Sequence, residues 1–437
     1  MKYADDIKGI LNAFHPHPLK ASEMAEFFYD GTMELRVGAT HVSPVEDIYD
    51  ACKIPGGNNT FLFLGHKGCG KSTELNKMAE ELRADDYYVT TILCDTDLNL
   101  ADPSFSDLLI LMGEALLEIA YEVNCDLDKD IEERLKSFWT TEIEKVEADR
   151  EISALSAETE AGAGFRAFWA DFFARVKGEL RFSSERSIEY RTKISHRASE
   201  WITIINIIAA NIAEKLDGKQ PIIIFEDLDK LDAKANDIEQ VWKIFSLRAA
   251  LLTAPDFPVI YSFPISLSYD PRFTSLEAYY TPKVLPMIKQ ETLDGKPFPE
   301  GTEAIRTIVK MRASLDLFDD GVLELLIEKT GGSLRDLFSA IIDSANRAIR
   351  RGSDSIAKED AKIALVQLQT SIIRRIDRSN YPFLIDIYKG NREHIEDKKM
   401  LLEMLRGKVV LEYNFKRWHD LHPLVSDFLE ETELVKT

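Results

Sequence analysis

Residues 60–82 read Thr60-Phe-Leu-Phe-Leu-Gly-His-Lys-Gly-Cys-Gly-Lys-Ser-Thr-Glu-Leu-Asn-Lys-Met-Ala-Glu-Glu-Leu82. The first five residues are an apolar run that predicts a buried strand. The apolar residues between Leu75 and Leu82 recur at helical spacing. A Gly-x4-Gly-Lys-Ser motif joins the two elements. This strand–loop–helix context predicts the phosphate-binding loop of a nucleoside triphosphatase.

The residue types of this loop suit a polyphosphate. Its glycines let successive backbone N–H groups point at phosphate oxygens, and the helix start adds partial positive charge. We expect Lys71 to reach the β- and γ-phosphates and the Ser72 hydroxyl to ligate Mg²⁺. A glycine-rich turn followed by Lys-Ser by chance is the alternative, which the flanking elements disfavour. The expected nucleotide-binding residues are Gly65, His66, Lys67, Gly68, Cys69, Gly70, Lys71, Ser72 and Thr73.

The bulk composition is that of an ordinary globular protein. The chain has 437 residues, 45% hydrophobic and 30% charged, which predicts about two or three domains. Its formal net charge of −21 disfavours non-specific binding to nucleic acid or to anionic membranes, because the overall field repels phosphate. A local basic patch is still compatible with that charge.

The cysteines and the apolar runs predict a cytoplasmic protein. The four cysteines form no Cys-x-x-Cys pair, and a disulfide at Cys69 would obstruct the phosphate loop. The acidic start Met1-Lys-Tyr-Ala-Asp-Asp lacks the apolar region of a signal peptide. No run approaches the roughly 18 apolar residues that span a bilayer.

A second apolar strand ends in acids, at Pro221-Ile-Ile-Ile-Phe-Glu-Asp-Leu-Asp-Lys-Leu231. Acids at the tip of such a strand can hold Mg²⁺ and orient or deprotonate the attacking water. We expect Glu226 on the metal side, Asp227 on the water side, and Asp229 as a brace for the following loop. Alternatively, these acids simply precede a loop, although the upstream phosphate loop favours the catalytic interpretation.

Two further segments offer groups for the terminal phosphate. Pro258 to Pro264 reads as a core strand whose Ser262 is a candidate for contacting the γ-phosphate or the attacking water. In Thr330-Gly-Gly-Ser-Leu-Arg-Asp-Leu337, glycines end one helix and Ser333 caps the next. Arg335 then lies in a first helical turn, where a cation needs an anionic partner. Nucleotide phosphate is one candidate partner, and Asp336 or another acid is the alternative.

These three motifs together resemble the P-loop, Walker B and sensor-2 segments of AAA+ ATPases. The likeness is to the branch that contains origin-recognition ATPases and the related STAND signalling ATPases. The P-loop run, with Tyr413-Asn and His422-Pro-Leu-Val, is also similar to uncharacterised bacterial AAA family ATPases. The resemblance implies an ATPase core with a helical lid, binding ATP with Mg²⁺.

The chain departs from that family pattern in two places. Pro264 stands near the position where many relatives carry a sensor-1 Asn. Arg272 lies where an arginine finger often occurs, although a loop arginine is commonly just solvated. Guanine specificity is not expected, because the chain has no Asn-Lys-x-Asp motif.

The predicted fold class is α/β, a P-loop NTPase parallel sheet with a long helical insertion, a helical lid and a C-terminal winged-helix-like domain. The resemblance to AAA+ ATPases implies that the N-terminal segment helps to bind the base of the nucleotide. The expected boundaries are residues 1–57 for the N-terminal segment, 58–300 for the core with its insertion at about 100–215, 301–378 for the lid, and 379–437 for the winged-helix-like domain.

The insertion carries an aromatic stripe at helical spacing. The stripe predicts packing against the core, a docking face for a partner protein, or, least favoured, a membrane-surface helix. Residues 153–164, rich in Ala, Ser and Glu, precede it and suggest a hinge that moves with nucleotide state. The stripe consists of Phe165, Phe168, Trp169, Phe172, Phe173 and Val176.

The last 58 residues, 380–437, read as helices followed by a small hairpin, which resembles a winged helix. Lys416 and Arg417 at the hairpin tip could contact a DNA backbone, although surface Lys-Arg pairs usually face water and the neighbouring residues are acidic. A protein contact is the favoured alternative. His419 and His422 lack the nearby ligands that a metal site needs.

We therefore expect an ATP-binding and slowly hydrolysing molecular switch of AAA+/STAND type, working on a protein partner or as a self-assembled oligomer. By analogy alone, bacterial signalling or anti-phage defence is a suitable setting. The alternatives are an ATP-regulated initiator or loader that binds DNA through the winged helix, and an interaction scaffold that does not hydrolyse ATP.

Overall fold

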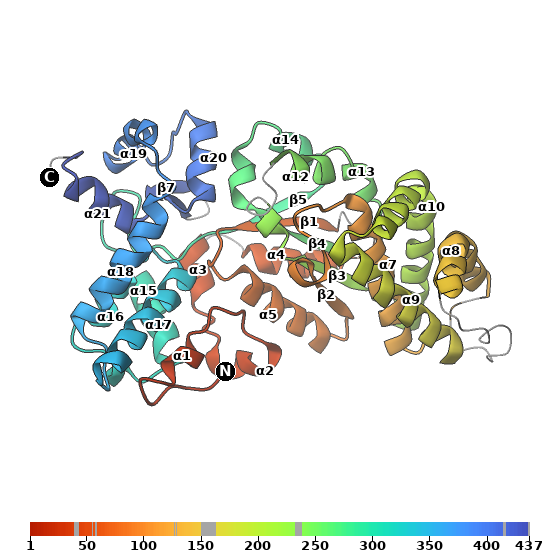
Figure 1. Ribbon diagram of the computed structural model, residues 1–437, viewed down its shortest axis with the longest axis horizontal. Helices are drawn as coiled ribbons and strands as arrows, with labels where there is room; N and C mark the ends of the chain where they lie inside the picture. The colour runs from red at the N-terminus through yellow and green to blue at the C-terminus, as the bar shows by residue number, and fades with distance from the viewer. Residues whose placement is uncertain are drawn as a thin grey trace.

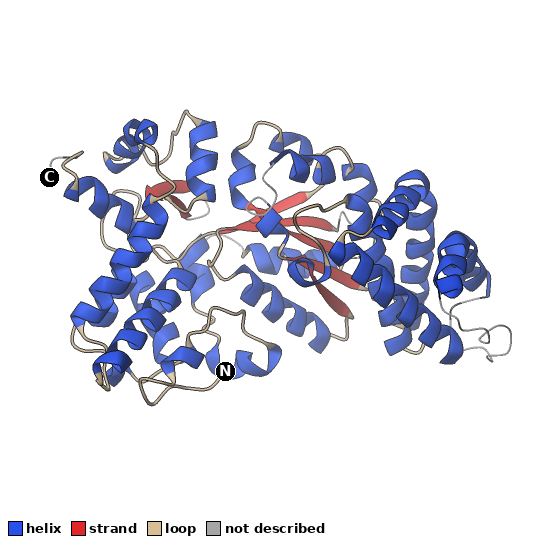
Figure 2. Cartoon of the chain, viewed as in Figure 1, coloured by secondary structure: helices blue, strands red, loops and turns tan. Residues whose placement is uncertain are grey.

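The computed structural model describes residues 1–38, 43–54, 56, 59–125, 127, 129–149, 163–231, 238–413 and 417–435. The molecule is elongated, with the main sheet near its centre (Figures 1 and 2). Residues 129–149 and 163–215 form helices at one end. Residues 299–413 and 417–435 form two helical bodies at the other end, and the N-terminal residues 10–37 lie beside them.

The central sheet has five strands, and all of its pairings are parallel. Every residue of three of these strands is buried, as expected when helices cover both faces of a parallel sheet. The predicted α/β fold with a parallel sheet is therefore confirmed. The strands are β1 (Thr60–Gly65), β2 (Val89–Leu93), β3 (Ile222–Glu226), β4 (Val259–Pro264) and β5 (Thr281–Leu285), in the order β2-β3-β4-β1-β5.

Strand β4 separates the P-loop strand β1 from the acid-bearing strand β3. In the register, Phe63 pairs with Ser262 and Phe225 pairs with Tyr261. The carboxyl ends of the three strands consequently meet at one edge of the sheet. Ligands of open parallel sheets bind at such edges.

Alternate residues of β1 face two different cores. Phe61 and Phe63 pack in a cluster with Leu75 and Met78 of α5 (Lys71–Ala84). Their neighbours Leu62 and Leu64 belong to the opposite cluster, which contains α7 (Phe105–Glu122). The helix that follows the P-loop is thereby fixed to the sheet by the apolar residues that predicted it.

The insertion is a helical body that continues the second of these cores. Trp139, Trp169 and Trp201 are fully buried there and contact one another or neighbouring phenylalanines. The interpretation of the aromatic stripe as core is confirmed at Trp169, Phe172, Phe173 and Val176; the side chain of Phe165 and residues 153–162 lie outside the described part of the chain. The helices are α8 (Lys129–Asp149), α9 (Ala163–Phe182) and α10 (Glu185–Lys215).

The lid consists of four helices that share a core with the N-terminus. Phe14 packs edge-on against Phe338, and the Ala4 N–H donates to the Arg312 carbonyl at 2.9 Å. The lid helices are α15 (Pro299–Lys310), α16 (Val322–Lys329), α17 (Leu334–Arg351) and α18 (Lys358–Ile373). The N-terminal helices are α1 (Ile10–Ala13), α2 (Ala21–Phe27), α3 (Thr32–Val37) and α4 (Pro44–Cys52).

The C-terminal module combines helices with an antiparallel pair of strands, as the sequence predicts. Its strand residues Leu411 and Tyr413 pack with Leu285 and Met287 beside the central sheet. The module comprises α19 (Tyr381–Tyr388), α20 (Lys398–Arg406), β6 (Val410–Tyr413), β7 (Trp418–Leu421) and α21 (Pro423–Glu431).

Short elements complete the described chain. In the described residues, no helix is both long enough and apolar enough to cross a bilayer. The short elements are α6 (Cys94–Asp97), α12 (Ile238–Phe245), α13 (Ala249–Leu252), α14 (Phe273–Leu276) and the 3-10 turns η1 (Leu228–Lys230), η2 (Ile265–Tyr269), η3 (Leu315–Leu317) and η4 (Arg378–Asn380).

The crossing of α7 and α10 should be sensitive to a single methyl group. A Cβ atom at Gly113 would lie 2.2 Å from the Trp201 ring, so Gly113→Ala should destabilise the protein by about 1–3 kcal/mol through overpacking. Gly178→Ala on α9 is the matched control, because nothing lies within 4 Å of its Cβ position. Thermal melts should show a lower midpoint for the first variant only; equal midpoints would contradict the close packing.

Candidate functional site

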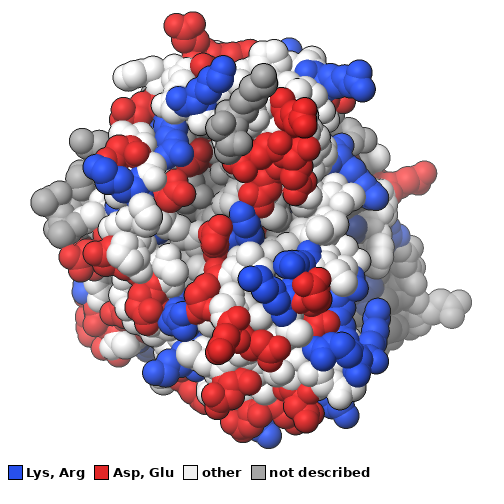
Figure 3. Space-filling view, turned by 90° about the vertical axis from the view of Figure 1, so that its left-hand side faces the viewer, with Lys and Arg blue, Asp and Glu red and all other residues white. Residues whose placement is uncertain are grey.

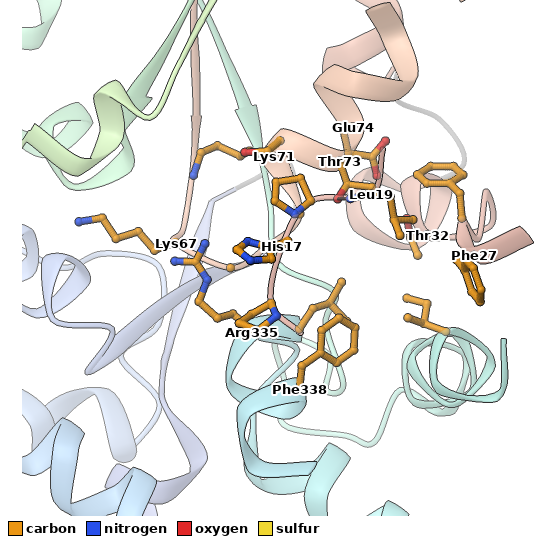
Figure 4. A pocket seen from close by; sticks show the side chains of 18 of the residues that line it. His17, Leu19, Phe27, Thr32, Lys67, Lys71, Thr73, Glu74, Arg335 and Phe338 are labelled. Carbon is orange, nitrogen blue, oxygen red and sulfur yellow. Dashed lines mark hydrogen bonds between the residues drawn. The ribbon is translucent and has the colours of Figure 1, made fainter. Parts of the chain in front are cut away.

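A cavity opens where the P-loop (residues 65–72), the N-terminal segment and the lid meet (Figure 4). It encloses about 960 Å³ of empty space, counting its open mouth. Of the residues predicted from sequence, Lys67, Gly68, Gly70, Lys71, Ser72, Thr73, Asp227 and Arg335 line it. The remaining predicted residues, Gly65, His66, Cys69, Glu226 and Ser262, are not among its lining residues.

The P-loop backbone depends on two glycines. Gly68 has φ +90° and Gly70 has φ +108°, a region that residues with a Cβ rarely adopt. Helix α5 begins directly afterwards at Lys71. Its unpaired N-terminal N–H groups therefore face the cavity, which is an arrangement suited to an anion.

Lys71 folds back over the loop and pairs with an acid. Its Nζ donates to the carbonyls of Gly65 (2.8 Å) and His66 (3.1 Å) and forms an ion pair with Asp229 Oδ2 at 2.8 Å. Burial alone would lower the pKa of Lys71, but Asp229 more than offsets this effect, so the pKa is raised. Burial likewise opposes ionisation of Asp229, yet Lys71 keeps the pKa of that carboxyl below its usual value.

This ion pair was not predicted from sequence, which assigned Asp229 only to bracing the loop. One residue separates the turn η1 from the end of β3, and the turn brings Asp229 back toward the P-loop. In the sequence, the spacing from Glu226 to Asp229 was the signal that could have indicated this ion pair. Only the relative placement of β1 and β3 turns that spacing into a contact.

Glu226 lies at the end of β3 against the Ser72 hydroxyl. Burial raises the pKa of this carboxyl to about 7. The charge of Asp227 adds to this increase, whereas the hydrogen bond from Ser72 opposes it. Its Oε1 atom is buried without a hydrogen-bond partner. A buried carboxylate oxygen beside a hydroxyl fits a Mg²⁺ ion, which takes one or two protein oxygens and completes its shell with water and phosphate.

Asp227 occupies a different environment from Glu226. Its backbone is left-handed, with φ +68°, a conformation that aspartate tolerates better than most residues. Its carboxylate lines the cavity and pairs with Lys230 at 2.8 Å. The two neighbouring acids thus point to separate places, one toward Ser72 and one toward Lys230.

Ser262 braces the turn that carries these acids. The buried hydroxyl accepts a hydrogen bond from the Leu228 N–H at 3.0 Å. It therefore connects β4 to η1. A direct role of Ser262 at the γ-phosphate stays a prediction.

Arg335 lies at the P-loop, in the first turn of α17. Its backbone N–H donates to the Gly68 carbonyl at 3.3 Å, and Figure 4 shows Arg335 and Lys67 on the same side of the cavity. Asp336, the alternative partner from sequence, instead pairs with Lys408 at 2.6 Å. Lys408 holds the pKa of Asp336 well below its usual value despite burial.

The opposite end of the cavity is largely apolar. Leu19 and Phe27 of the N-terminal segment and Ile308 and Phe338 of the lid line it. Leu19 is held by its backbone, because its carbonyl accepts from Asn76 Nδ2 at 3.0 Å. A cavity with a cationic end and an apolar end suits a phosphorylated ligand that carries a planar base.

Two arginines differ from the sequence expectation. Arg36, which sequence analysis did not single out, is buried and donates to the Cys69 carbonyl at 2.8 Å, so it supports the P-loop from behind. Burial lowers the pKa of Arg36. Arg272, the candidate finger, does not line the cavity; it pairs with Asp270 (2.8 Å) and Glu239 (2.7 Å).

The C-terminal module contacts the P-loop through His66. The His66 Nε2 accepts from the Glu412 N–H at 2.8 Å. Glu412 in turn pairs with Arg417 at 2.7 Å and accepts from the Tyr269 hydroxyl at 2.8 Å. Arg417 is therefore engaged within the protein, and Lys416 lies outside the described residues.

The two C-terminal histidines have separate roles within the module. His419 Nε2 lies 2.7 Å from the Tyr269 hydroxyl. His422 Nδ1 accepts from the Leu424 N–H at the start of α21. Among the described residues, no group of three or more His, Cys, Asp or Glu is placed to hold a metal.

No protein-family model and no curated protein sequence matches the chain. Solved structures that resemble it include a Walker-type ATPase of Pyrococcus abyssi, with a TM-score of 0.46 at 13% identity over 95% of this chain and 99% of the other. The Aeropyrum pernix ORC2 protein in its ADPNP-ADP complexes gives a TM-score of 0.37 at 11% identity over 90% and 94%. Drosophila ORC bound to DNA gives 0.35 at 11% over 96% and 94%.

The approach of the lid to the P-loop should depend on the missing side chain of Gly68. A Cβ atom there would lie 2.4 Å from the Arg335 Cβ, so Gly68→Ala should displace α17 and weaken the ATP binding that the sequence predicts by about tenfold or more. Gly352→Ala is the control: its φ is also positive, at +74°, but nothing lies within 4 Å. Calorimetry should show unchanged ATP affinity for the control, and equal losses in both variants would contradict the lid contact.

Acid should weaken the docking of the C-terminal module on the P-loop. Burial lowers the pKa of His66 to about 3, whereas the unfolded chain has a histidine pKa of about 6.5. The stabilisation is therefore complete above about pH 6.5 and is lost as the pH falls toward the folded value. His66→Gln can still accept from Glu412 but gains no proton. Between about pH 7.5 and 5, the melting temperature of the wild type should fall more than that of the variant; parallel curves would refute this.

Proposed function

We propose that this chain binds ATP together with Mg²⁺ and hydrolyses it slowly, as a nucleotide-dependent switch of AAA+/STAND type. The observation that carries the proposal is that one cavity brings together the P-loop residues Lys71 and Ser72, the acid Asp227 and the lid residue Arg335. Glu226 stands directly behind Ser72. These elements come from distant parts of the sequence.

Each group has a role that follows from its position. The N–H groups of the P-loop and Lys71 would bind the phosphates, and Arg335 would add charge from the lid. Ser72 and Glu226 would hold Mg²⁺, which neutralises developing charge on the phosphates. Asp227 would orient the attacking water and accept its proton.

Slow hydrolysis is supported by the ion pairs of the site. Lys71 is bound to Asp229 and Asp227 is bound to Lys230, so both pairs must rearrange before the groups can act on a nucleotide. Arg272 is held by acids outside the cavity. The arginine-finger candidate Arg272 is therefore engaged by acids and not free to act.

The response to nucleotide would pass to the lid and the C-terminal module. Gly68 contacts the lid at Arg335, and His66 contacts the module at Glu412. A change of P-loop conformation therefore strains both contacts directly. We propose that the output is a protein contact or self-assembly; a role in bacterial signalling or defence stays an analogy.

A DNA-binding role is the weaker alternative for this end of the molecule. Figure 3 shows acidic and basic side chains intermixed on this face, without a continuous basic tract among the residues described. DNA binding would need such a tract to neutralise phosphates. The groove between the lid and the C-terminal module is lined by Glu291, Glu324, Glu328, Asp420, Asp427 and Glu430, against Lys329 and Arg392.

Two substitutions separate binding from hydrolysis. Lys71→Ala should weaken ATP binding by about 10- to 100-fold, because charged hydrogen bonds to phosphate are lost. Asp227→Asn should retain binding but lose about 10²-fold or more of the turnover. Calorimetry with ATP and Mg²⁺ measures the binding, and a phosphate-release assay measures the turnover.

Lys77→Ala is the control for the first substitution, because Lys77 is on the same helix but does not line the cavity. A wild type that gives no heat with ATP and Mg²⁺ would overturn the proposal. An Asp227→Asn variant with wild-type phosphate release would leave ATP binding in the proposal but would remove Asp227 as the group that activates the water.

A further inference from the structure

Lys230 is a cation that lines the proposed nucleotide cavity and pairs with Asp227. It belongs to η1, the turn after β3, and lines the same cavity as Lys71 and Ser72. Its Nζ lies 2.8 Å from Asp227 Oδ1 and 3.1 Å from Asp95 Oδ2. It thus joins an acid of the cavity to an acid outside it, because Asp95 is not a lining residue.

The other described cations of the cavity come from different elements. Lys67 and Lys71 belong to the P-loop, and Arg335 and Arg312 belong to the lid region. Arg36 belongs to α3 and is bound to the Cys69 carbonyl. Among the described lining residues, Lys230 is therefore the cation on the β3 side, where Asp227 would hold the attacking water.

The turn fixes Lys230 and Asp227 next to each other. The Lys230 N–H donates to the Asp227 carbonyl at 3.0 Å, and Asp227 has the left-handed φ of +68° that closes the turn. The Lys230 side chain is 31% exposed and the Asp227 side chain is 22% exposed. Such a partly solvated ion pair is weak and exchanges readily.

A terminal phosphate would compete well for Lys230. Burial opposes the charge on Lys230, but Asp227 and Asp95 more than compensate and raise its pKa, so it is a cation at neutral pH. A γ-phosphate offers more negative charge and more acceptor oxygens than one carboxylate. A nucleoside diphosphate lacks this group.

We propose that Lys230 detects the γ-phosphate: it moves from Asp227 to the terminal phosphate of a bound nucleoside triphosphate and remains tethered to Asp95. This inference rests on the proposed function. The exchange frees the Asp227 carboxylate only when a triphosphate is present. The water oxygen then bonds to the γ-phosphorus, the bond to the β–γ bridging oxygen breaks, the diphosphate leaves with that electron pair, and Asp227 accepts the water proton.

The test compares ATP with ADP in three variants. Lys230→Ala should weaken ATP binding by about tenfold or more, because a charged contact to the phosphate is lost. The same variant should change the affinity for ADP by no more than about twofold. Lys230→Arg keeps the charge and should restore most of the preference for ATP. Titration calorimetry with Mg²⁺ and each nucleotide gives the ratios, and retained ADP binding shows that the variants are folded.

Asp95→Asn is the matched control. If Lys230 served only to tie η1 to α6, Asp95→Asn would reproduce the loss seen with Lys230→Ala. The inference instead expects that Asp95→Asn keeps an ATP-to-ADP preference within about twofold of the wild type. Equal losses of ATP and ADP in Lys230→Ala, or unchanged ATP affinity, would overturn the inference while the wild type still binds and hydrolyses ATP. A wild type that binds neither nucleotide would instead overturn the proposed function itself.

Discussion

The parallel pairing of β1, β4 and β3 is the constraint on which the site depends. These three strands are buried on both faces, so their register is fixed by two cores at once. Their carboxyl ends therefore meet at one edge, with the P-loop on β1 and the acids on β3. The remaining groups act through this edge, because the lid and the C-terminal module both contact the P-loop.

Charge balance within the cavity follows from that arrangement. Lys71 of the P-loop and Lys230 of the turn after β3 each pair with an acid of that turn, Asp229 for Lys71 and Asp227 for Lys230. Glu226 stands apart, buried against Ser72, with a raised pKa. A phosphorylated ligand with a divalent cation would replace these internal pairs by pairs of its own. This replacement gives the ligand a direct way to change the conformation of the turn.

The C-terminal module is coupled to the site through backbone and buried polar contacts. The β6 backbone donates to His66 in the P-loop, and the Tyr413 hydroxyl donates to the Gly331 carbonyl at 2.8 Å, just before the lid helix α17. Both contacts are buried, where an unmade hydrogen bond is costly. A ligand that changed the P-loop conformation would therefore change the docking of the module, and the docking would change the affinity for that ligand by the same factor.

The amino-acid sequence by itself determined the P-loop, the strand and helix around it, the acidic strand, the lid motif and the C-terminal hairpin. Each of these depends on local patterns: glycines for positive φ, apolar spacing, and capping residues. The sequence also allowed the aromatic stripe to be a core or a surface. Only the tertiary structure decided that Trp169 and Phe173 are buried, that Asp229 pairs with Lys71, and that His66 accepts a hydrogen bond from Glu412. The physical reason is that these contacts join residues far apart in the chain, and their distances are set by strand order and helix packing, which local periodicity does not encode.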